Sequence, residues 1–367
     1  MVGIRSAKPE DSRQKGWKSG PLLGIESSCD ETAAAVLGSD GTVLSNIVAS
    51  QQAVHEKFGG VVPELAARAH LGKIDLVVMR ALEEARVSKG DLQAIAVTQG
   101  PGLAGALLVG VNYAKALSYG LGIPLVGVNH LQGHIASAWL ADPTFPLPCI
   151  VLVVSGGHTH LYRREANGEC LLLGRTRDDA AGEAFDKGAQ MLGLGYPGGP
   201  AMDLIARIGD RQAIPFPRFH GARSSLEFSF SGLKTSLLYK LRGMATPLNQ
   251  RQIADLAAGY QEAIVQVLVT KALSALKQSN LSAIAVVGGV SANSRLRAVL
   301  SERAEHGQIR LSLPSMEFCT DNAAMIASAG RQRLMRGEPW SPILDICPTD
   351  GSMTSVGARP VTTSFQK

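Results

Sequence analysis

Two histidines placed four residues apart, His130 and His134, are the pair in this sequence best suited to chemistry. Side chains four positions apart on a helix share one face, so both imidazoles can bind a single metal ion. The zinc-protease helix motif needs a Glu directly after its first His, and Leu131 stands at that position. The spacing therefore predicts half of a metal site without the base of a metallopeptidase. Two ordinary histidines near a helix start are the alternative.

A third metal ligand is predicted at Asp321, which stands just before a small, apolar, helix-like run at 323–327. Capping of that helix by Asp321 is the alternative interpretation. Two imidazoles and one carboxylate leave open coordination positions for water or substrate oxygens. Such a set suits iron(II) or zinc acting as a Lewis acid or an anchor, and the sequence does not choose between these metals.

Three glycine-rich turns follow strand-like or turn-like segments, at Ser155-Gly156-Gly157, Gly198-Gly199 and Gly288-Gly289. Glycine lets backbone amides approach phosphate oxygens closely, although each pair alone is more simply a tight turn. None of the three fits a P-loop or a dinucleotide-binding motif. A Walker-type ATPase and a dehydrogenase are therefore not favoured.

Carboxylates gather in two places that could take part in chemistry. Glu26, Asp30 and Glu31 flank a Ser-Ser-Cys turn, where they could hold a metal or simply form the turn. Asp186 lies in a second acidic segment and could accept hydrogen bonds from a ribose or an amine, whereas a solvated first helical turn is the alternative. No general base can be assigned among Asp30, Glu31, His158 and Asp186.

One segment, residues 216–223, mixes aromatic side chains with the cations Arg218 and Arg223. Cations of this kind pair with phosphates, and bases stack on aromatic rings. The segment is therefore a candidate RNA contact.

The composition sets limits on the class of protein. With 367 residues, 45% of them hydrophobic, the chain can form two domains. Its apolar runs are too short to span a membrane, and its start lacks the apolar region of a secretory signal. Five widely spaced cysteines favour neither a disulfide framework nor a zinc ribbon, which predicts a reducing cytoplasm. A net charge of +5 permits an anionic partner without requiring one.

The order of the predicted elements repeats along the chain. A strand, a polar turn and a returning strand follow residue 21, and the same order returns near the middle of the chain. Two further strands, at 94–97 and 283–286, each lead into a glycine loop and a helix. The predicted strands are 22–26, 33–37, 42–48, 94–97, 150–154, 158–163 and 283–286, and the predicted helices are 63–85, 103–119, 252–278 and 293–305. Two similar α/β lobes are expected, with a loose tail beyond Trp340.

Short motifs recur in a fixed order between residues 22 and about 330. They lie at 24–32, 64–70, 129–134, 154–159, 182–187, 196–200, 230–235, 288–293 and 319–322. In sequence and order these motifs resemble those of the bacterial TsaD family. Residues 1–21 and the tail lie outside the resemblance.

The resemblance implies an α/β fold of the actin-like ATPase type, with two similar lobes and a central cleft. Lobe I would comprise residues 22–128, with a helix at about 322–337 packing back on it. Lobe II would comprise 129–321 and carry the nucleotide and metal site. Residues 1–21 would form a polar N-terminal extension and 340–367 a tail.

Carried over to matching positions, the resemblance implies that His130, His134 and Asp321 bind one divalent metal, with Fe(2+) favoured and Zn(2+) as the alternative. An adenine nucleotide, as threonylcarbamoyl-adenylate, ATP or AMP, would lie in the cleft. The residues implied to bind it are Val153, Val154, Ser155, Gly156, Gly157, Asp186, Gly199, Asp203 and Asn293. Asp30 and Glu31 are the candidates for a catalytic role.

The reaction implied by the resemblance is transfer of threonylcarbamoyl from the adenylate to N6 of adenosine 37 in tRNAs reading codons that begin with A. AMP would be released. The implied partners are the tRNA anticodon loop and companion proteins similar to TsaB and TsaE, in the cytoplasm and without a membrane. An actin-like ATP-binding regulator without transferase activity is the main alternative, and a metallopeptidase is the second.

Overall fold

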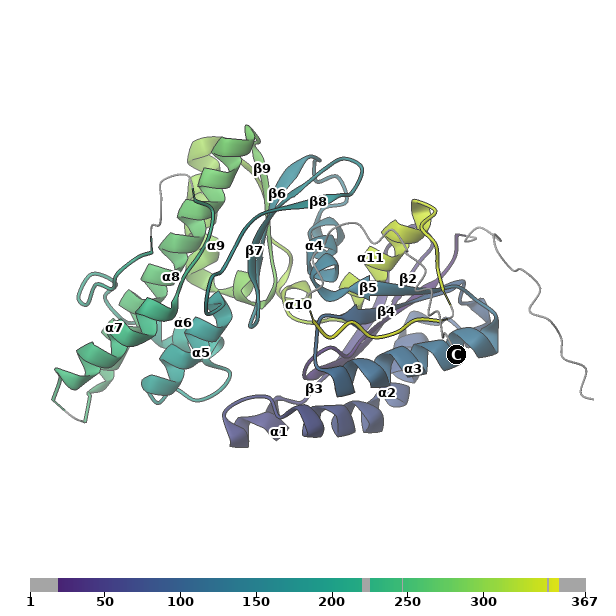
Figure 1. Cartoon of the computed structure of the whole chain (residues 1–367), viewed down its shortest axis with the longest axis horizontal. Helices are drawn as coiled ribbons and strands as arrows, with labels where there is room; N and C mark the ends of the chain where they lie inside the picture. The colour runs from purple at the N-terminus through teal and green to yellow at the C-terminus, as the bar shows by residue number, and fades with distance from the viewer. Residues whose placement is uncertain (1–18, 220–224, 246, 342, 350–367) are drawn as a thin grey trace, which may run out of the picture.

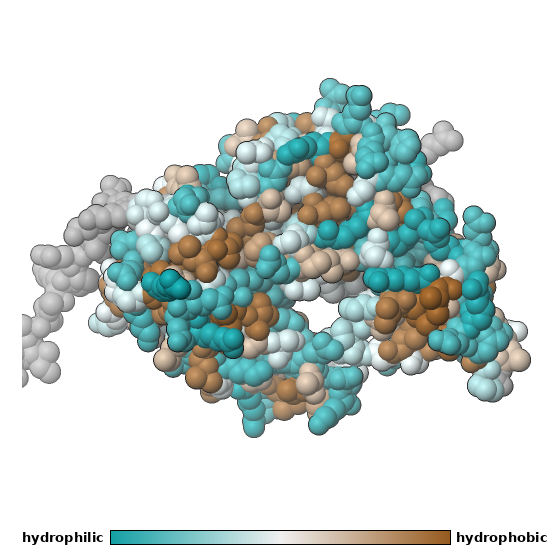
Figure 2. Space-filling model, turned by 180° about the vertical axis from the view of Figure 1, so that it is seen from behind, coloured by the Kyte–Doolittle hydropathy of each residue, from teal (hydrophilic) through white to brown (hydrophobic). Residues whose placement is uncertain are grey.

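Two lobes lie side by side, each built on a β-sheet covered by helices (Figure 1). The computed structural model describes residues 19–219, 225–245, 247–341 and 343–349. Seen from behind, an opening separates the lower parts of the two lobes (Figure 2). A site between the lobes would therefore draw residues from both of them.

Lobe I is a five-stranded sheet in the order β3-β2-β1-β4-β5. Strand β1 is antiparallel to β2 and parallel to β4. All residues of β1 are buried, because α2 and α3 pack on one face of the sheet and α11 on the other. The elements of lobe I are β1 Leu22–Glu26, β2 Glu31–Leu37, β3 Val43–Ser50, α1 Gln52–His55, α2 Pro63–Ala85, β4 Ala94–Gly100, α3 Ala104–Leu121, β5 Leu125–Asn129 and α11 Ala323–Met335.

Lobe II is a second five-stranded sheet, in the order β10-β9-β6-β7-β8. Strand β6 is antiparallel to β7 and parallel to β9, so read from β8 the topology is that of lobe I read from β3. Its elements are β6 Cys149–Val154, β7 Thr159–Arg164, β8 Cys170–Arg175, α5 Ala181–Met191, α6 Gly198–Ala206, α7 Ser231–Arg242, α8 Gln250–Ser279, β9 Ala283–Val287, α9 Ser294–Gly307, β10 Arg310–Ser312 and α10 Met316–Cys319. The expected duplication is confirmed.

Helix α4, His130–Ala141, lies between the two sheets (Figure 1). Leu131 and Ile135 pack with the apolar side chains of β6 and β9, whereas Ala136 belongs to the core of lobe I. The helix also packs along α11. Because α4 contacts both lobes, a boundary between them at residue 129 stays a proposal.

Most predicted strands and helices are present with ends shifted by a few residues. Strand β8 was not predicted, because Leu171 and Leu172 are exposed and the strand lacks the alternation of a half-buried one. No helix in the described part of the chain is both long and apolar enough to cross a bilayer.

The expectation of a loose tail beyond Trp340 is wrong for residues 343–348. The backbone N–H of Cys347 donates to the carbonyl of Gln99 at 2.8 Å, and Lys115 Nζ donates to the carbonyl of Leu344 at 3.0 Å. Leu344 and Ile346 pack against the core of lobe I, and this burial of apolar surface holds the segment in place. Residues 1–18 of the expected N-terminal extension and 350–367 of the tail lie outside the described residues.

Candidate metal and nucleotide site

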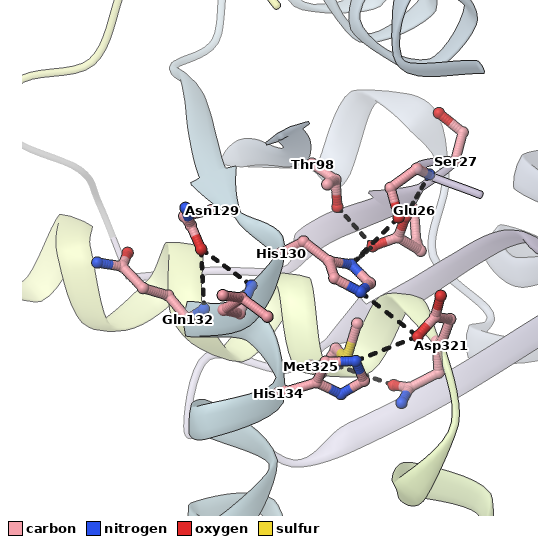
Figure 3. A network of polar contacts seen from close by, with 12 residues as sticks. Glu26, Ser27, Thr98, Asn129, His130, Gln132, His134, Asp321 and Met325 are labelled. Atoms are coloured by element: carbon pink, nitrogen blue, oxygen red, sulfur yellow. Dashed lines mark hydrogen bonds and ion pairs between the residues drawn. The ribbon is translucent and has the colours of Figure 1, made fainter. Parts of the chain in front are cut away.

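The two histidines lie in the first turns of α4. The side chain of Asn129 caps this helix by accepting hydrogen bonds from the N–H groups of Leu131 at 2.9 Å and Gln132 at 3.3 Å. The cap fixes where the helix begins, so His130 and His134 project toward the same side (Figure 3). His134 is fully buried, and His130 is nearly so.

Asp321 faces these histidines and does not cap α11. Asn322 is the cap, since its side chain accepts a hydrogen bond from the N–H of Met325 at 3.0 Å. The carboxylate of Asp321 lies 3.1 Å from His134 Nε2 and 3.5 Å from His130 Nε2 (Figure 3). The capping interpretation of Asp321 is therefore wrong, and its carboxylate is free to act with the histidines.

Three potential metal ligands thus come together. One ligand atom each from His130, His134 and Asp321 lies within 4.8 Å of the others. The side chain of His134 is fully buried; its Nδ1 has no hydrogen-bond partner among the described residues, and its Nε2 faces the carboxylate of Asp321 at 3.1 Å. Two imidazole nitrogens that converge on one carboxylate are a donor set that metal ions such as Zn²⁺ and Fe²⁺ use. The residues therefore fit a divalent cation.

Glu26 supports His130 from lobe I. Its carboxylate oxygen Oε2 lies 3.0 Å from His130 Nδ1 and also accepts a hydrogen bond from Thr98 Oγ1 at 2.6 Å. The other oxygen accepts from the N–H of Ser28 at 2.5 Å. These contacts orient the imidazole with Nε2 toward Asp321. The sequence offers one sign of this role, a carboxylate at the end of an otherwise apolar strand.

Strong charge coupling follows from this packing. Burial lowers the pKa of His130, but the carboxylates of Asp321 and Glu26 outweigh it and raise that pKa to about 9. Burial raises the pKa of Asp321 and of Glu26, whereas His130 brings each of them below its usual value. The cluster therefore holds charge of both signs away from solvent.

The acidic loop of lobe I lies beside this cluster. Burial, with Asp321 and Asp30, raises the pKa of Glu31 to about 10, so Glu31 carries a proton at neutral pH. His70 of α2 lies 3.0 Å from the carbonyl of Cys29 and ties the loop to that helix. The catalytic roles of Asp30 and Glu31 stay predictions.

The first glycine turn of lobe II lies open to the space in front of it. A Cβ added at Gly156 or Gly157 would meet no atom within 4 Å. Ser155 closes the turn, since its N–H donates to the carbonyl of His158 at 2.8 Å. The side chains of Val153 and Val154 are fully buried in the sheet, so only their backbone can face a ligand.

The second glycine turn is held by Asp186. One oxygen of this carboxylate accepts hydrogen bonds from the N–H of Gly198 at 2.8 Å and of Gly199 at 3.3 Å. Burial raises the pKa of Asp186, although these two hydrogen bonds act against the increase. The space next to Gly199 is open, as it is at Gly156. Asp186 therefore holds the backbone of this turn in place, and its predicted contact with a ligand stays a prediction.

Asp203 and Asn293 meet through the start of α9. Asp203 accepts a hydrogen bond from Ser294 Oγ at 2.7 Å and pairs with Arg207 at 3.0 Å. Asn293 caps α9 with its side-chain oxygen and donates to Gln261 Oε1 at 2.7 Å. Both residues are at least nine-tenths buried, and they join the start of α9 to α6 and α8.

The candidate RNA segment is only partly described. Phe216 is buried, with its ring edge-to-face against Tyr260 at 5.4 Å between centroids, so it cannot stack on a base. The expectation is wrong at that position because the chain turns Phe216 into the core of lobe II. Arg218 is exposed, and residues 220–223 lie outside the described residues.

Fold and site together define this chain as an α/β protein of the actin-like ATPase type, with two lobes of one topology. Its structure is similar to the crystal structure of HypF from T. kodakarensis, with a TM-score of 0.58 and 14% identity over 88% of this chain and 48% of that one. A second HypF structure, in a phosphate- and nucleotide-bound form, gives a TM-score of 0.55 at 12% identity, over 88% of this chain and 56% of that one.

The sequence comparisons define the family. The family model for TsaD, tRNA N6-adenosine threonylcarbamoyltransferase, matches residues 42–328. Curated proteins of that name are 50% identical in Clostridioides difficile, over 89% of this chain and 96% of the relative, and 51% identical in Syntrophus aciditrophicus, over 86% and 93%. A relative in Anaeromyxobacter dehalogenans is 52% identical over 89% of this chain and 98% of its own length. The chain belongs to the TsaD family.

Proposed function

We propose that this chain transfers the threonylcarbamoyl group from threonylcarbamoyl-adenylate to N6 of adenosine 37 in tRNAs that read codons beginning with A. AMP leaves in this reaction. The observation that carries the proposal is the cluster of His130, His134 and Asp321 in a chain that belongs to a family of tRNA threonylcarbamoyltransferases. The printed names of the relatives supply the reaction, and the cluster supplies a place for it.

In this proposal the three clustered side chains hold one divalent metal, with Fe(2+) favoured and Zn(2+) as the alternative. When bound, the metal would supply a Lewis acid for oxygens of the substrate. With Nδ1 of His130 directed to Glu26, Nε2 would be the atom that His130 offers to the metal. Leu131 stands where a zinc protease has its Glu, which argues against the metallopeptidase alternative.

The nucleotide part of the substrate would lie against lobe II. A Cβ added at Gly156, Gly157 or Gly199 would meet no atom within 4 Å, so a phosphate group can approach the backbone of these turns closely. Asp186, Asp203 and Asn293 hold the surrounding turns and helix ends in place. We therefore assign adenylate binding to the predicted set in lobe II, through backbone groups at positions 153–157.

The chemistry is acyl-type group transfer. The N6 amine of the adenosine forms a bond to the carbamoyl carbonyl carbon, and the bond from that carbon to the phosphate oxygen of AMP breaks. The amine loses a proton, and AMP takes the bonding electron pair. Positioning and preorganised amide donors account for the rate without a side-chain nucleophile.

Partners follow from the same proposal. The tRNA anticodon loop brings the adenosine, and companion proteins similar to TsaB and TsaE would work with the chain in the cytoplasm. Exposed apolar side chains on α2, including Leu71 and Leu76, offer a surface for such a companion.

A reconstituted reaction tests the proposal. The purified chain, TsaB, TsaE, ATP, unmodified tRNA and fresh threonylcarbamoyl-adenylate are incubated, and the digested tRNA is analysed by mass spectrometry. Threonylcarbamoyladenosine is expected. Its absence, with companions that are active in a parallel reaction, would favour the ATP-binding regulator instead.

A further inference from the structure

A cavity of about 710 Å³ lies at the far ends of the two helices beside the metal-ligand cluster. Helix α4 begins at His130, and its later residues Trp139 and Leu140 line the cavity. Helix α11 follows Asp321, and residues near its other end line the cavity as well. The turn between β2 and β3 of lobe I and the turn between β7 and β8 of lobe II complete the walls.

Arg164 places a buried positive charge in the wall of this cavity. Its side chain is 7% exposed, its Nη2 donates to Gln332 Oε1 at 2.6 Å, and its guanidinium lies 4.4 Å from the centroid of Trp139. Its Nε has no hydrogen-bond partner, and no carboxylate of the described residues forms an ion pair with it. A buried cation without a counter-ion is unfavourable, so an anion in the cavity would stabilise this arrangement.

The other charged groups of the lining leave a positive excess. Arg331 and Arg336 also line the cavity, and Asp40 is the single lining carboxylate among the described residues. Asp40 is already engaged, accepting hydrogen bonds from the N–H of Thr42 at 3.0 Å and its Oγ1 at 2.7 Å. Arg336 is paired with Glu338 at 2.6 Å. Arg331 Nε also lacks a hydrogen-bond partner among the described residues, so Arg164 and Arg331 share the uncompensated charge.

We propose that this cavity binds a small organic anion, with a phosphate or carboxylate group near Arg164 and an apolar body against Leu140 and Phe318. Those two side chains and Trp139 give the lining an apolar part. The volume lies within the usual range of roughly 300–1,000 Å³ for small-molecule sites. Because the lining comes from both lobes and from both helices, an occupant would join the ends of α4 and α11. This inference does not depend on the transferase reaction.

Calorimetric titration of the full chain tests the proposal with named probes. Phenyl phosphate and phenylacetate supply the two anionic groups, and benzyl alcohol is the neutral control. Excess adenosine, which carries no anionic group, is present to occupy the nucleotide site. One site is expected for at least one anionic probe, with affinity at least tenfold above that for benzyl alcohol. Comparison of the two anionic probes shows whether phosphate or carboxylate is preferred.

Two variants place the binding at this cavity. Arg164→Gln removes the buried charge, and Met335→Glu adds a negative charge at a lining residue that is 61% exposed, so this second variant should fold. Each should weaken the anionic probe at least tenfold. Tyr119→Glu makes the same charge change at a side chain on α3 that does not line the cavity, and should bind normally. No binding by the wild type, or unchanged binding by Met335→Glu, would overturn the proposal.

Discussion

The two lobes share one strand order but differ in the turn after the first strand of each sheet. In lobe I, β1 ends at the buried Glu26 and leads into the acidic loop around Glu31. In lobe II, β6 leads into Ser155-Gly156-Gly157, where no side chain fills the space in front of the glycines. The same strand order therefore serves two purposes. In lobe I it supplies a carboxylate that supports a metal ligand, and in lobe II it supplies a glycine turn whose exposed backbone suits an anion.

The second pair of glycine loops differs as well. A Cβ at Gly100, after β4 of lobe I, would overlap the carbonyl of Cys347, because the segment 343–348 covers this loop. In the loop after β9 of lobe II, a Cβ at Gly288 would meet the carbonyl of Val154, whereas one at Gly289 would meet nothing within 4 Å. The chain thus covers one of its two equivalent loops with its own C-terminal segment.

The largest effect is expected from loss of His130, a proposed metal-binding side chain that contacts Glu26 of lobe I. His130→Ala should remove bound metal and lower tRNA modification at least about a hundredfold, because a Lewis acid supplies several kcal/mol. Metal content by mass spectrometry and modified nucleoside after a fixed time measure the two effects. His306→Ala, on the exposed end of α9, is the matched control and should change neither. Full modification by His130→Ala would remove the metal assignment.

A smaller loss is expected when the support from lobe I is weakened. Glu26→Gln should reduce affinity for Co²⁺, followed by its visible absorption, by roughly 10- to 100-fold, since the amide orients His130 less firmly. Glu64→Gln is the control, because Glu64 is an exposed carboxylate on α2 that pairs with Arg68 and does not contact the cluster. Equal Co²⁺ affinities in wild type and Glu26→Gln would mean that Glu26 does not support metal binding by His130.

The glycine turn of lobe II can be tested without disturbing the fold. Gly157→Ala places a methyl group in open space, so stability should stay unchanged while affinity for AMP falls about tenfold, or about 1.4 kcal/mol. Gly72→Ala, at an equally open position on α2 of lobe I, should leave AMP affinity unchanged. Titration calorimetry separates the two. Identical AMP affinity in both variants would place the nucleotide elsewhere.

Sequence patterns predicted the strands and long helices because buried strands read as apolar runs and helices as periodic ones. They also predicted His130 and His134 as a pair, since four-residue spacing is local. They could not predict that Glu26 contacts a histidine 104 positions away, because sheet topology decides that contact. Nor could they separate Asp321 from Asn322 as the helix cap, because either residue type can serve.

The smallest effect concerns Asp178, which holds the start of α7 in lobe II. Although burial raises its pKa, hydrogen bonds from Ser229, Phe230 and Ser231 bring the pKa below the usual 3.8. A lowered folded-state pKa adds stability above the unfolded value, and this contribution is lost as the pH falls through the folded value. Because Asp178 is exposed and solvent screens its charge, Asp178→Asn should cost less than about 1 kcal/mol at pH 6.

Urea unfolding at two pH values checks this sign. The difference between wild type and Asp178→Asn should shrink at pH 3, whereas Glu64→Gln, which removes an exposed ion pair with Arg68, should match wild type at both. A difference that grows at pH 3 would contradict the assignment.

The central claim is that the two lobes bring three side chains together around one metal. Anomalous diffraction from crystals soaked with Fe(2+) or Zn(2+) tests it directly. We predict a single strong peak within bonding distance of His130 Nε2, His134 Nε2 and the carboxylate of Asp321. A peak at other side chains, or none at this cluster in a fully soaked crystal, would contradict the account.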